Sequence, residues 1–172
     1  MTLPTLRTLT VHADDRGNVR EAYRASWFPF LPPIKQIVRS KSKPATLRGM
    51  HAHKRQFDIW HVVKGWMFVQ TYDHRSGEHW SGELNAGSTL VIPPGVSHGF
   101  YTEGGCILTY FLTEEYDGTD EFGWFPFDAD FPGADLWPTP YYQTVGEAVV
   151  LHISDRDLEA QSLADFAAAW DE

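Results

Sequence analysis

The amino-acid sequence predicts a mainly β protein, an antiparallel sandwich or barrel, that ends in a helix. Short alternating or apolar runs, separated by Gly and Pro, recur from residue 5 to about residue 112. Aromatic residues make up 15% of the chain, which suits a β-rich fold with a lined cavity. Near the end of the chain the apolar residues change to helical spacing. At 172 residues the chain is long enough for one core and short for two, so we expect a single domain over residues 1–172.

Six apolar runs account for the expected strands, and polar turn sequences separate them. The runs are "TLRTLTVH" (5–12), "IKQIVRS" (34–40), "DIWHVVKGWMFVQTYD" (58–73), "HWSGEL" (79–84), "STLVIPP" (88–94) and "CILTYFLT" (106–113). The turn sequences supply Gly, Asn, Asp or Pro, and "DDRGN" (14–18) predicts a hairpin turn.

The last third of the chain contains two different segments. Residues 113–144 combine many aromatic residues with prolines and show no sustained period, so we expect an irregular segment packed over the barrel. In "SDRDLEAQSLADFAAAW" (154–170) the apolar residues lie near helical spacing, and Ser154 and Asp157 can cap a first turn. This pattern predicts one terminal helix.

Charge and composition exclude some partners. Fourteen Lys and Arg against 23 Asp and Glu give a net charge of −9, which disfavours nucleic acid or an anionic membrane as partner. The single Cys106 lies in an apolar run, so we expect a buried, inert thiol. The first residues include charges and a proline where a signal peptide needs an apolar stretch, and no window approaches membrane-spanning length. We therefore expect a cytoplasmic protein.

Two glycine-bounded stretches contain a possible metal site. "LRGMHAHKRQFDIWHVVKG" (47–65) contains His51, His53 and Asp58, and "GSTLVIPPGVSHGFYT" (87–102) contains His98. His51 and His53 are two residues apart, so on a strand they point to the same side. Imidazole and carboxylate together suit a divalent transition metal.

The order and spacing of these stretches resemble the paired motifs of the cupin family. The resemblance implies a double-stranded β-helix, or jelly-roll barrel, with His51, His53, Asp58 and His98 around one cavity. His61 is expected to face away from this set. The sequence departs from the cupin pattern in having Asp58 where Glu is usual and Thr102 where Asn is usual.

A narrower resemblance covers residues 10–160, to the dTDP-4-dehydrorhamnose 3,5-epimerase family of nucleotide-sugar enzymes. "DDRGNVRE", "SKSKPATLRGMH", "VVKGWMFVQTYDHR", "IPPGVSHGF", "LTYFLTEEYD" and "ISDRD" are each similar to a motif of that family, in the same order. The resemblance implies that His51 is the base that removes the proton beside the sugar ketone, that Asp157 is its carboxylate partner, and that Tyr110 is the acid. Base and acid on opposite faces of the sugar invert a stereocentre.

The same resemblance implies a set of substrate-binding residues and a homodimer. The set is Arg16, Glu21, Gln36, Arg48, His53, Asp58, His98 and Tyr116. Arg16 and Glu21 would reach across from a second subunit, and forked hydrogen bonds from arginines would hold the diphosphate. No cofactor is favoured, and a divalent metal remains possible.

Each assignment has a structural alternative. Asp157 can simply cap the terminal helix, Tyr110 can be a core residue, Arg16 can decorate a turn, and Arg48 can form a surface ion pair.

One departure from the epimerase pattern affects the chemistry directly. The family has a lysine aimed at the ketone oxygen, and Asp58 stands in its place. Loss of one preorganised donor typically costs about 3 kcal/mol of barrier. Three explanations for the missing lysine stay open. Arg48 or Lys54 can supply the cation instead, a bound metal can polarise the ketone, or the substrate and reaction differ from those of the family. A metal bound to His51 would exclude its role as a base. The family's aromatic pair after the first motif is also missing, since Asn18 and Val19 stand there.

Other functions stay open from the sequence. "RGMHAHK" resembles the motif of the cupin 3,4-ketoisomerases that act on dTDP-4-keto-6-deoxyglucose, in which His53 would be a second acid or base. A metal-dependent cupin enzyme, such as a dioxygenase or lyase, is a different class. A non-catalytic sugar-binding cupin is a third possibility.

Overall fold

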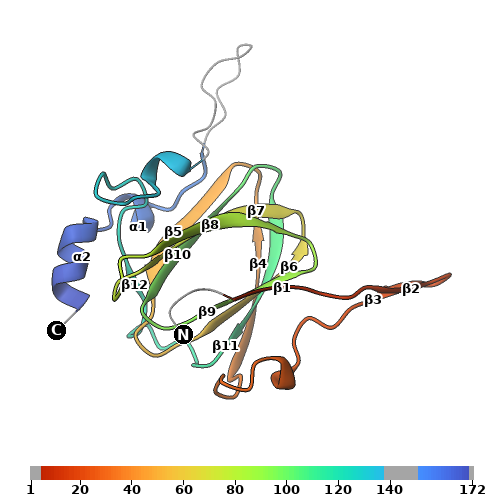
Figure 1. Ribbon diagram of the computed structural model, residues 1–172. Coiled ribbons are helices and arrows are strands. Elements are labelled where there is room, and N and C mark those ends of the chain that lie inside the picture. The colour runs from red at the N-terminus through yellow and green to blue at the C-terminus, as the bar shows by residue number, and fades with distance from the viewer. Residues whose placement is uncertain (1–4, 138–150, 171–172) are drawn as a thin grey trace, which may run out of the picture.

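The structure, a computed structural model, describes residues 5–137 and 151–170, and its body consists of two packed antiparallel sheets (Figure 1). In spatial order, the first sheet contains β1 (Thr5–Thr8), β9 (Ser88–Ile92), β6 (Asp58–Lys64), β11 (Cys106–Leu112) and β4 (Gln36–Ser42). The second contains β12 (Phe122–Gly123), β5 (Thr46–Ala52), β10 (Val96–Thr102), β7 (Trp66–Asp73) and β8 (His79–Asn85). This is the double-sheet barrel expected from the sequence.

The core between the sheets is apolar at one end and polar at the other. Alternation along β6 turns Asp58, Trp60 and Val62 to the inside, so this face changes from polar to apolar within one strand. The buried apolar residues include Met67, Val69, Leu84, Leu90, Phe100, Cys106 and Leu108. Cys106 is buried as expected, and burial raises its pKa, which keeps the thiol protonated.

A second apolar cluster lies on the outer face of the second sheet. Trp124, Phe131 and Trp137 pack with Phe166 against residues of β5 and β10. Residues 113–137 therefore form the irregular aromatic cover that the sequence predicts, with only the short strand β12 and the 3₁₀ turn η2 (Ala134–Leu136). The expectation for residues 138–144 lies outside the described part of the chain.

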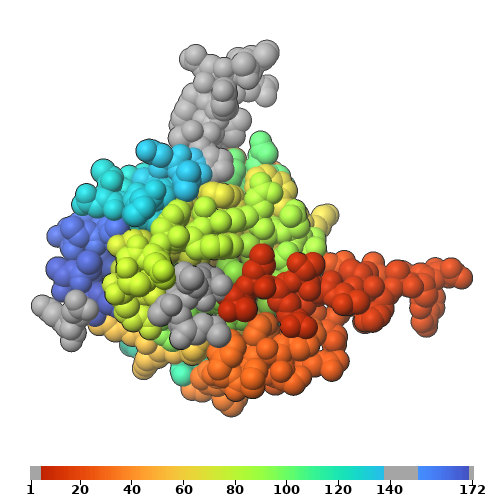
Figure 2. All heavy atoms as spheres, in the orientation of Figure 1, coloured from red at the N-terminus to blue at the C-terminus, as the bar shows by residue number. Residues whose placement is uncertain are grey.

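The predicted hairpin at residues 14–18 is present and extends away from the body. Strands β2 (His12–Asp14) and β3 (Gly17–Val19) pair only with each other, and all their residues are exposed. Figures 1 and 2 show this hairpin as an arm that projects beyond the two sheets. The 3₁₀ turn η1 (Ala25–Trp27) leads from the arm back to the barrel.

The C-terminal helical segment expected from the sequence is present, and it is divided into two short helices. Helix α1 (Asp155–Leu158) is capped by Ser154, whose hydroxyl accepts from the Asp157 amide at 3.2 Å. Helix α2 (Leu163–Trp170) begins after Ser162, whose hydroxyl accepts from the Asp165 amide at 3.0 Å. "SLAD" thus repeats the capping pattern of "SDRD", and each serine starts its own helix.

Two strands, β5 and β10, correspond to none of the apolar runs in the sequence. Strand β5 contains a β-bulge, and strand β10, "VSHGFYT", is buried along its whole length, so neither alternates. Both were visible only through the histidine motifs.

Candidate active site

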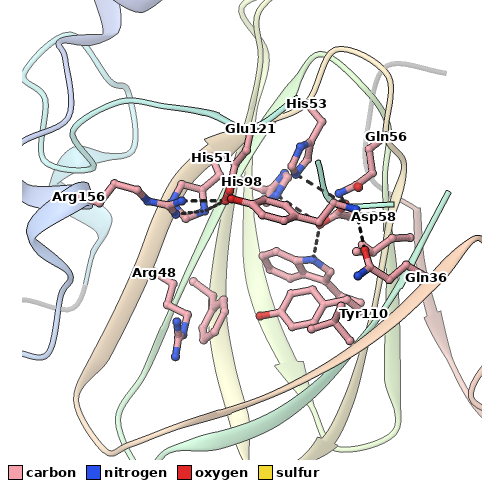
Figure 3. Close-up of a pocket in the computed structure, with 15 residues that line it drawn as sticks. Gln36, Arg48, His51, His53, Gln56, Asp58, His98, Tyr110, Glu121 and Arg156 are labelled. Atoms are coloured by element: carbon pink, nitrogen blue, oxygen red, sulfur yellow. Dashed lines mark hydrogen bonds and ion pairs between the residues drawn. The ribbon is translucent and has the colours of Figure 1, made fainter. Parts of the chain in front are cut away.

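A cavity of about 400 Å³ opens between the two sheets at their polar end (Figure 3). Its lining includes eight of the residues expected from the sequence: Gln36, Arg48, His51, His53, Asp58, His98, Tyr110 and Tyr116. Val38, Gln56, Trp60, Phe100, Leu112, Glu121 and Arg156 complete the wall.

A bulge in β5 brings Arg48 and His51 to the same cavity. His51 pairs with His98 and Arg48 pairs with Phe100, so three steps along β5 match two steps along β10. The extra residue restores the inward direction for two side chains that strict alternation would separate. Gly49, inside the bulge, has φ of +125°, a conformation that favours glycine.

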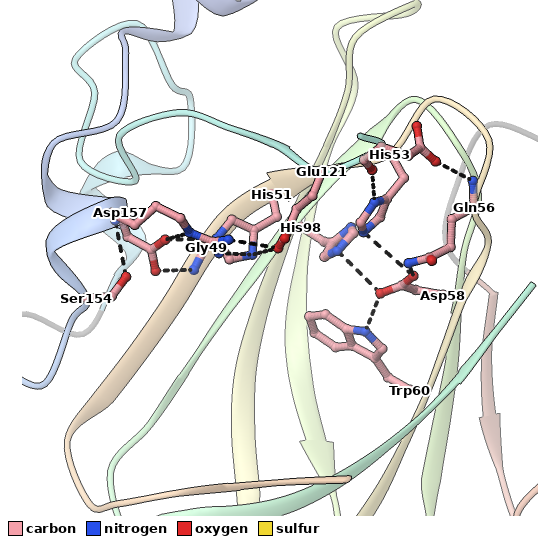
Figure 4. Close-up of polar contacts among 12 residues, drawn as sticks. Gly49, His51, His53, Gln56, Asp58, Trp60, His98, Glu121, Ser154 and Asp157 are labelled. Carbon is pink, nitrogen blue, oxygen red and sulfur yellow. Dashed lines mark hydrogen bonds and ion pairs between the residues drawn. The ribbon is translucent and has the colours of Figure 1, made fainter. Parts of the chain in front are cut away.

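His51 is hydrogen bonded to Asp157, which comes from α1. His51 Nε2 lies 2.8 Å from Asp157 Oδ1, and the Gly49 amide donates to Oδ2 at 3.3 Å (Figure 4). Burial would raise the pKa of Asp157, but the hydrogen bond and charge of His51, the Gly49 amide and Arg156 outweigh it and hold the pKa below its ordinary value. Asp157 is therefore ionised at neutral pH and also lies in the capped first turn of α1.

Arg156 and Glu121 also line the cavity and were not predicted from the sequence. Arg156 Nη2 lies 2.6 Å from His51 Nε2, and its Nη1 lies 3.1 Å from Glu121 Oε1. One ring nitrogen cannot accept from Arg156 while donating to Asp157, so these two contacts alternate. When Nε2 donates to Asp157, Nδ1 carries the lone pair that a base requires. Arg156 directly precedes Asp157, which was a usable signal; Glu121 lies in the irregular segment and gave none.

Tyr110 reaches the cavity from the opposite sheet, on β11. Its hydroxyl forms a hydrogen bond with Ser40 Oγ at 3.0 Å, and its ring packs edge-on against Trp60. Burial raises the pKa of Tyr110 to about 12, so the phenol remains protonated at neutral pH. A protonated phenol can donate a hydrogen bond to a group in the cavity.

Asp58 lies between His53 and His98 in a second polar group (Figure 4). Its two oxygens accept from Gln56 Nε2 at 2.6 Å and from Trp60 Nε1 at 3.1 Å. Burial lowers the pKa of His98 to about 4, although the charge of Asp58 opposes this shift. Nitrogen or oxygen atoms of His53, Asp58 and His98 lie within 4.8 Å of one another.

Of the four possible ligands considered from the sequence (His51, His53, Asp58 and His98), the last three have ligand atoms within 4.8 Å of one another. His51 is not part of the cluster, because its ring is engaged by Asp157 and Arg156. His61 also lies outside it, as expected. It follows Asp58 by three residues on β6, so it faces the other side and contacts Thr89 Oγ1 at 3.1 Å.

Arg16 and Glu21 are not brought to the cavity within one chain. Arg16 lies at the tip of the arm, paired with Asp14 at 2.7 Å and 90% exposed, and Glu21 pairs with Arg24. Lys54 is also absent from the cavity wall, since its ammonium lies over the rings of Phe122 and Trp170. Arg48 lines the cavity but lies at the far end from Asp58 (Figure 3).

Gln36 and Tyr116 lie at the rim of the cavity. The Tyr116 amide donates to Gln36 Oε1 at 2.9 Å, and the Tyr116 side chain is exposed. An exposed aromatic ring at a cavity mouth offers a surface on which a sugar or base can pack.

Among the described residues, no helix is long and apolar enough to span a membrane.

The sequence was compared with models of protein families and with known proteins. The family model described as dTDP-4-dehydrorhamnose 3,5-epimerase matches residues 4–165. The spore coat polysaccharide biosynthesis protein SpsL of Bacillus subtilis (strain 168) is 33% identical over 121 residues, which are 65% of this chain and 80% of SpsL.

Two solved structures have the same fold along nearly the whole chain. The dTDP-4-dehydrorhamnose 3,5-epimerase of Sulfolobus tokodaii is 29% identical, with a TM-score of 0.73, covering 94% of this chain and 90% of that one. NovW, described as a 4-keto-6-deoxy sugar epimerase of Streptomyces spheroides, is 25% identical, with a TM-score of 0.80, covering 97% of this chain and 86% of that one.

Proposed function

The chain belongs to the dTDP-4-dehydrorhamnose 3,5-epimerase family, and from this premise we propose that it epimerises a dTDP-linked 4-keto-6-deoxy sugar at C3, C5 or both. The observation that supports this most is the pairing of His51 with Asp157 on one wall of the cavity, while Tyr110 comes from the opposite sheet. A base and an acid on opposite walls are what inversion of a carbon centre requires.

In the proposed reaction, His51 removes the proton from the carbon beside the ketone. The carboxylate of Asp157, ionised because its pKa is low, fixes the ring orientation and stabilises the imidazolium that forms. Tyr110 then donates its hydroxyl proton to the other face of the same carbon. Its raised pKa keeps that proton available at neutral pH. His51 and Tyr110 thus carry out the two proton transfers.

The nucleotide would be held by arginines from two chains. Arg48 lines the cavity, while the exposed arm has length and polarity suited to reach a neighbouring subunit. We propose a homodimer in which Arg16 and Glu21 of each arm complete the partner's site. Paired guanidinium groups bind a diphosphate by forked hydrogen bonds, which offsets the net negative charge of the chain. A nucleotide-linked substrate also fits the cytoplasmic location expected from the sequence.

A 3,4-ketoisomerase is the second candidate, and the position of His53 favours it. His53 lines the cavity together with His51, so a second histidine is available to move a proton between neighbouring carbons. The two candidates differ in product, because ketoisomerisation moves the carbonyl from C4 to C3 and epimerisation leaves it in place.

The test is incubation with dTDP-4-keto-6-deoxyglucose in heavy water, followed by proton NMR of the sugar. We expect exchange at C3 or C5 with the ketone retained at C4, and loss of that exchange in His51→Asn. His61→Gln is the matched control, because His61 lies outside the cavity wall. No exchange at high enzyme concentration would contradict the proposal, and a C3 ketone would favour the isomerase.

A further inference from the structure

Three groups in the cavity point their electron pairs at one small region. His53 Nδ1 contacts the carbonyl oxygen of Asp120, and His98 Nδ1 lies 3.1 Å from the carbonyl oxygen of Val96. A carbonyl accepts only, so each Nδ1 carries a hydrogen and, in a neutral ring, each Nε2 carries a lone pair. Both Nε2 atoms face the carboxylate of Asp58, which is also an acceptor. Acceptors that face one another repel, so a positive charge at the centre, either a proton or a bound cation, would stabilise the arrangement.

The separations fit a bridging ion better than direct hydrogen bonds. His53 Nε2 lies 3.8 Å from Asp58 Oδ1, and His98 Nε2 lies 3.6 Å from Oδ2. These distances are beyond a hydrogen bond. Two ligand atoms that each lie about 2.1 Å from one metal ion are roughly 3.4 Å apart at a tetrahedral angle and about 3.8 Å apart at an angle of about 130°. Small side-chain shifts would bring all three groups to coordination distance.

The surroundings of the cluster hold its members in place. The backbone carbonyls fix both imidazole rings, and Gln56 and Trp60 donate to the two oxygens of Asp58. Hydrogen bonds of this kind behind each ligand are the usual support of a protein metal site. Asp58 and His98 are also almost fully buried, so neither serves as a solvated surface charge.

We propose that His53, Asp58 and His98 bind one divalent transition-metal ion. Two imidazoles and one carboxylate suit Mn²⁺, Fe²⁺, Co²⁺, Ni²⁺ or Zn²⁺, and three protein ligands leave open positions toward the cavity. His51 is not a ligand, so it remains free to act as a base, and the two uses of the histidine motif no longer exclude each other.

The role of the ion rests on the proposed epimerase function. Asp58 stands where the family has a lysine, and its carboxylate alone would oppose the charge of an enolate. One carboxylate and one divalent ion leave a net charge of about +1, which is the charge that the lysine would supply. An open position on the metal would accept the ketone oxygen and polarise it as a Lewis acid.

The binding test uses the intact protein and the metal alone. After removal of bound metal with a chelator and removal of the chelator, the protein is titrated with Co²⁺ and its visible absorption is recorded. We expect about one Co²⁺ per chain with ligand-field bands. Asp58→Asn and His98→Gln should each weaken binding by roughly 100-fold or more, since even outer hydrogen-bond partners contribute 10- to 100-fold. Absence of Co²⁺ bands in the wild type would overturn the site.

Two histidine variants test the identity of the ligands. His51→Asn and His61→Gln should bind Co²⁺ as the wild type does, because neither residue belongs to the cluster. Circular dichroism of each metal-free variant checks that it is folded. Loss of binding in folded His51→Asn, or full binding in Asp58→Asn, would contradict the assignment.

A separate measurement tests the role of the ion. Metal-free and Co²⁺-loaded enzyme are compared for exchange of the sugar protons in heavy water, and we expect at least about a 10-fold faster rate with metal. Equal rates would overturn the Lewis-acid role. Binding is measured without any sugar, so failure of the epimerase proposal cannot be mistaken for failure of the metal site.

Discussion

Asp157 has two roles in the structure, as a partner of His51 and as a residue of the capped first turn of α1. Its backbone amide serves the helix, while its carboxylate serves His51 and Gly49. Substitution of the side chain therefore separates the two roles. Asp157→Asn keeps the backbone bond to Ser154 and removes the negative charge.

We expect Asp157→Asn to slow sugar-proton exchange by roughly 100-fold or more, because an amide can neither stabilise the imidazolium nor hold the same ring tautomer. The measurement is exchange in heavy water at saturating sugar, with thermal unfolding as the check on folding. Ser154→Ala is the matched control, since it weakens the cap and leaves the carboxylate. An unchanged rate in folded Asp157→Asn would reduce Asp157 to a helix cap.

The same carboxylate makes stability depend on pH in the acidic range. The pKa of Asp157 is lower in the folded chain than its ordinary value of 3.8. The ionised carboxylate of Asp157 therefore stabilises the folded chain fully above about pH 4, and this stabilisation is lost as the pH falls through the lowered pKa of the folded state. We expect the difference in unfolding free energy between wild type and Asp157→Asn to shrink from pH 5 to pH 2.5, measured by urea unfolding. A constant difference would contradict the low pKa.

Tyr110 should affect inversion more than proton removal. In Tyr110→Phe, His51 can still remove a proton and return a deuteron to the same face, but no acid serves the other face. We expect inverted product to fall by roughly 100-fold or more while exchange with retention continues. Ser40→Ala, which removes only the hydroxyl partner of Tyr110, should have a smaller effect. Equal loss of both rates in Tyr110→Phe would contradict its role as the second acid.

Sequence reasoning was sufficient where a side chain has a fixed place in a motif. It placed His51, His53, Asp58, His98 and Tyr110 together, and the structure brings them to one cavity. It left His51 with two alternative roles, as the base paired with Asp157 or as a metal ligand, because the choice depends on how Asp157, distant in the sequence, is placed in the fold. Glu121 was missed because it lies in the irregular segment, where no local pattern predicts which side chains reach the site, whereas Arg156 could have been found from its position next to Asp157.

At the scale of elements, most strands were predicted from apolar runs, and β5 and β10 were not. The runs cover β1, β4, β6 to β9 and β11. Strand β5 lacks regular alternation because its bulge turns Arg48 and His51 to the same side, and β10 is buried on both faces. The second serine cap explains in the same way why one predicted helix became two.

The bulge itself depends on glycine at position 49. A Cβ there would lie 2.6 Å from the Gly99 Cα, and the φ of +125° disfavours any other residue. We expect Gly49→Ala to lower the free energy of unfolding by roughly 1–3 kcal/mol and to displace Arg48 and His51, with lower activity. Gly104→Ala is the control, because a Cβ at Gly104 meets nothing within 4 Å. The check is urea unfolding, and equal stability of the two variants would contradict the constraint.

At the scale of the whole molecule, the arm formed by β2 and β3 stands apart, because neither strand pairs with either sheet of the barrel. Its residues are exposed and pair only with each other, and Figure 1 shows it pointing away from the barrel. An isolated two-stranded hairpin is marginally stable in water. In the proposed homodimer, the second subunit would cover the arm and receive Arg16 at its own cavity, so each site would be completed by both chains.

Mixed dimers test this arrangement directly. Arg16→Ala would remove the arm's cation from the partner's site, and His51→Asn would remove the base from its own site, so each pure variant should be nearly inactive. A mixed dimer has one cavity with an intact His51 that receives Arg16 from the other chain. Random mixing makes about half of the dimers mixed, so we expect recovery of about a quarter of wild-type activity. The two variants are co-expressed with different tags, and the doubly tagged mixed dimer is purified. Its rate of sugar-proton exchange should be about half of the wild-type rate, because one of its two cavities is complete. If Arg16 instead served its own chain, every cavity would lack one group and the mixed dimer would stay inactive.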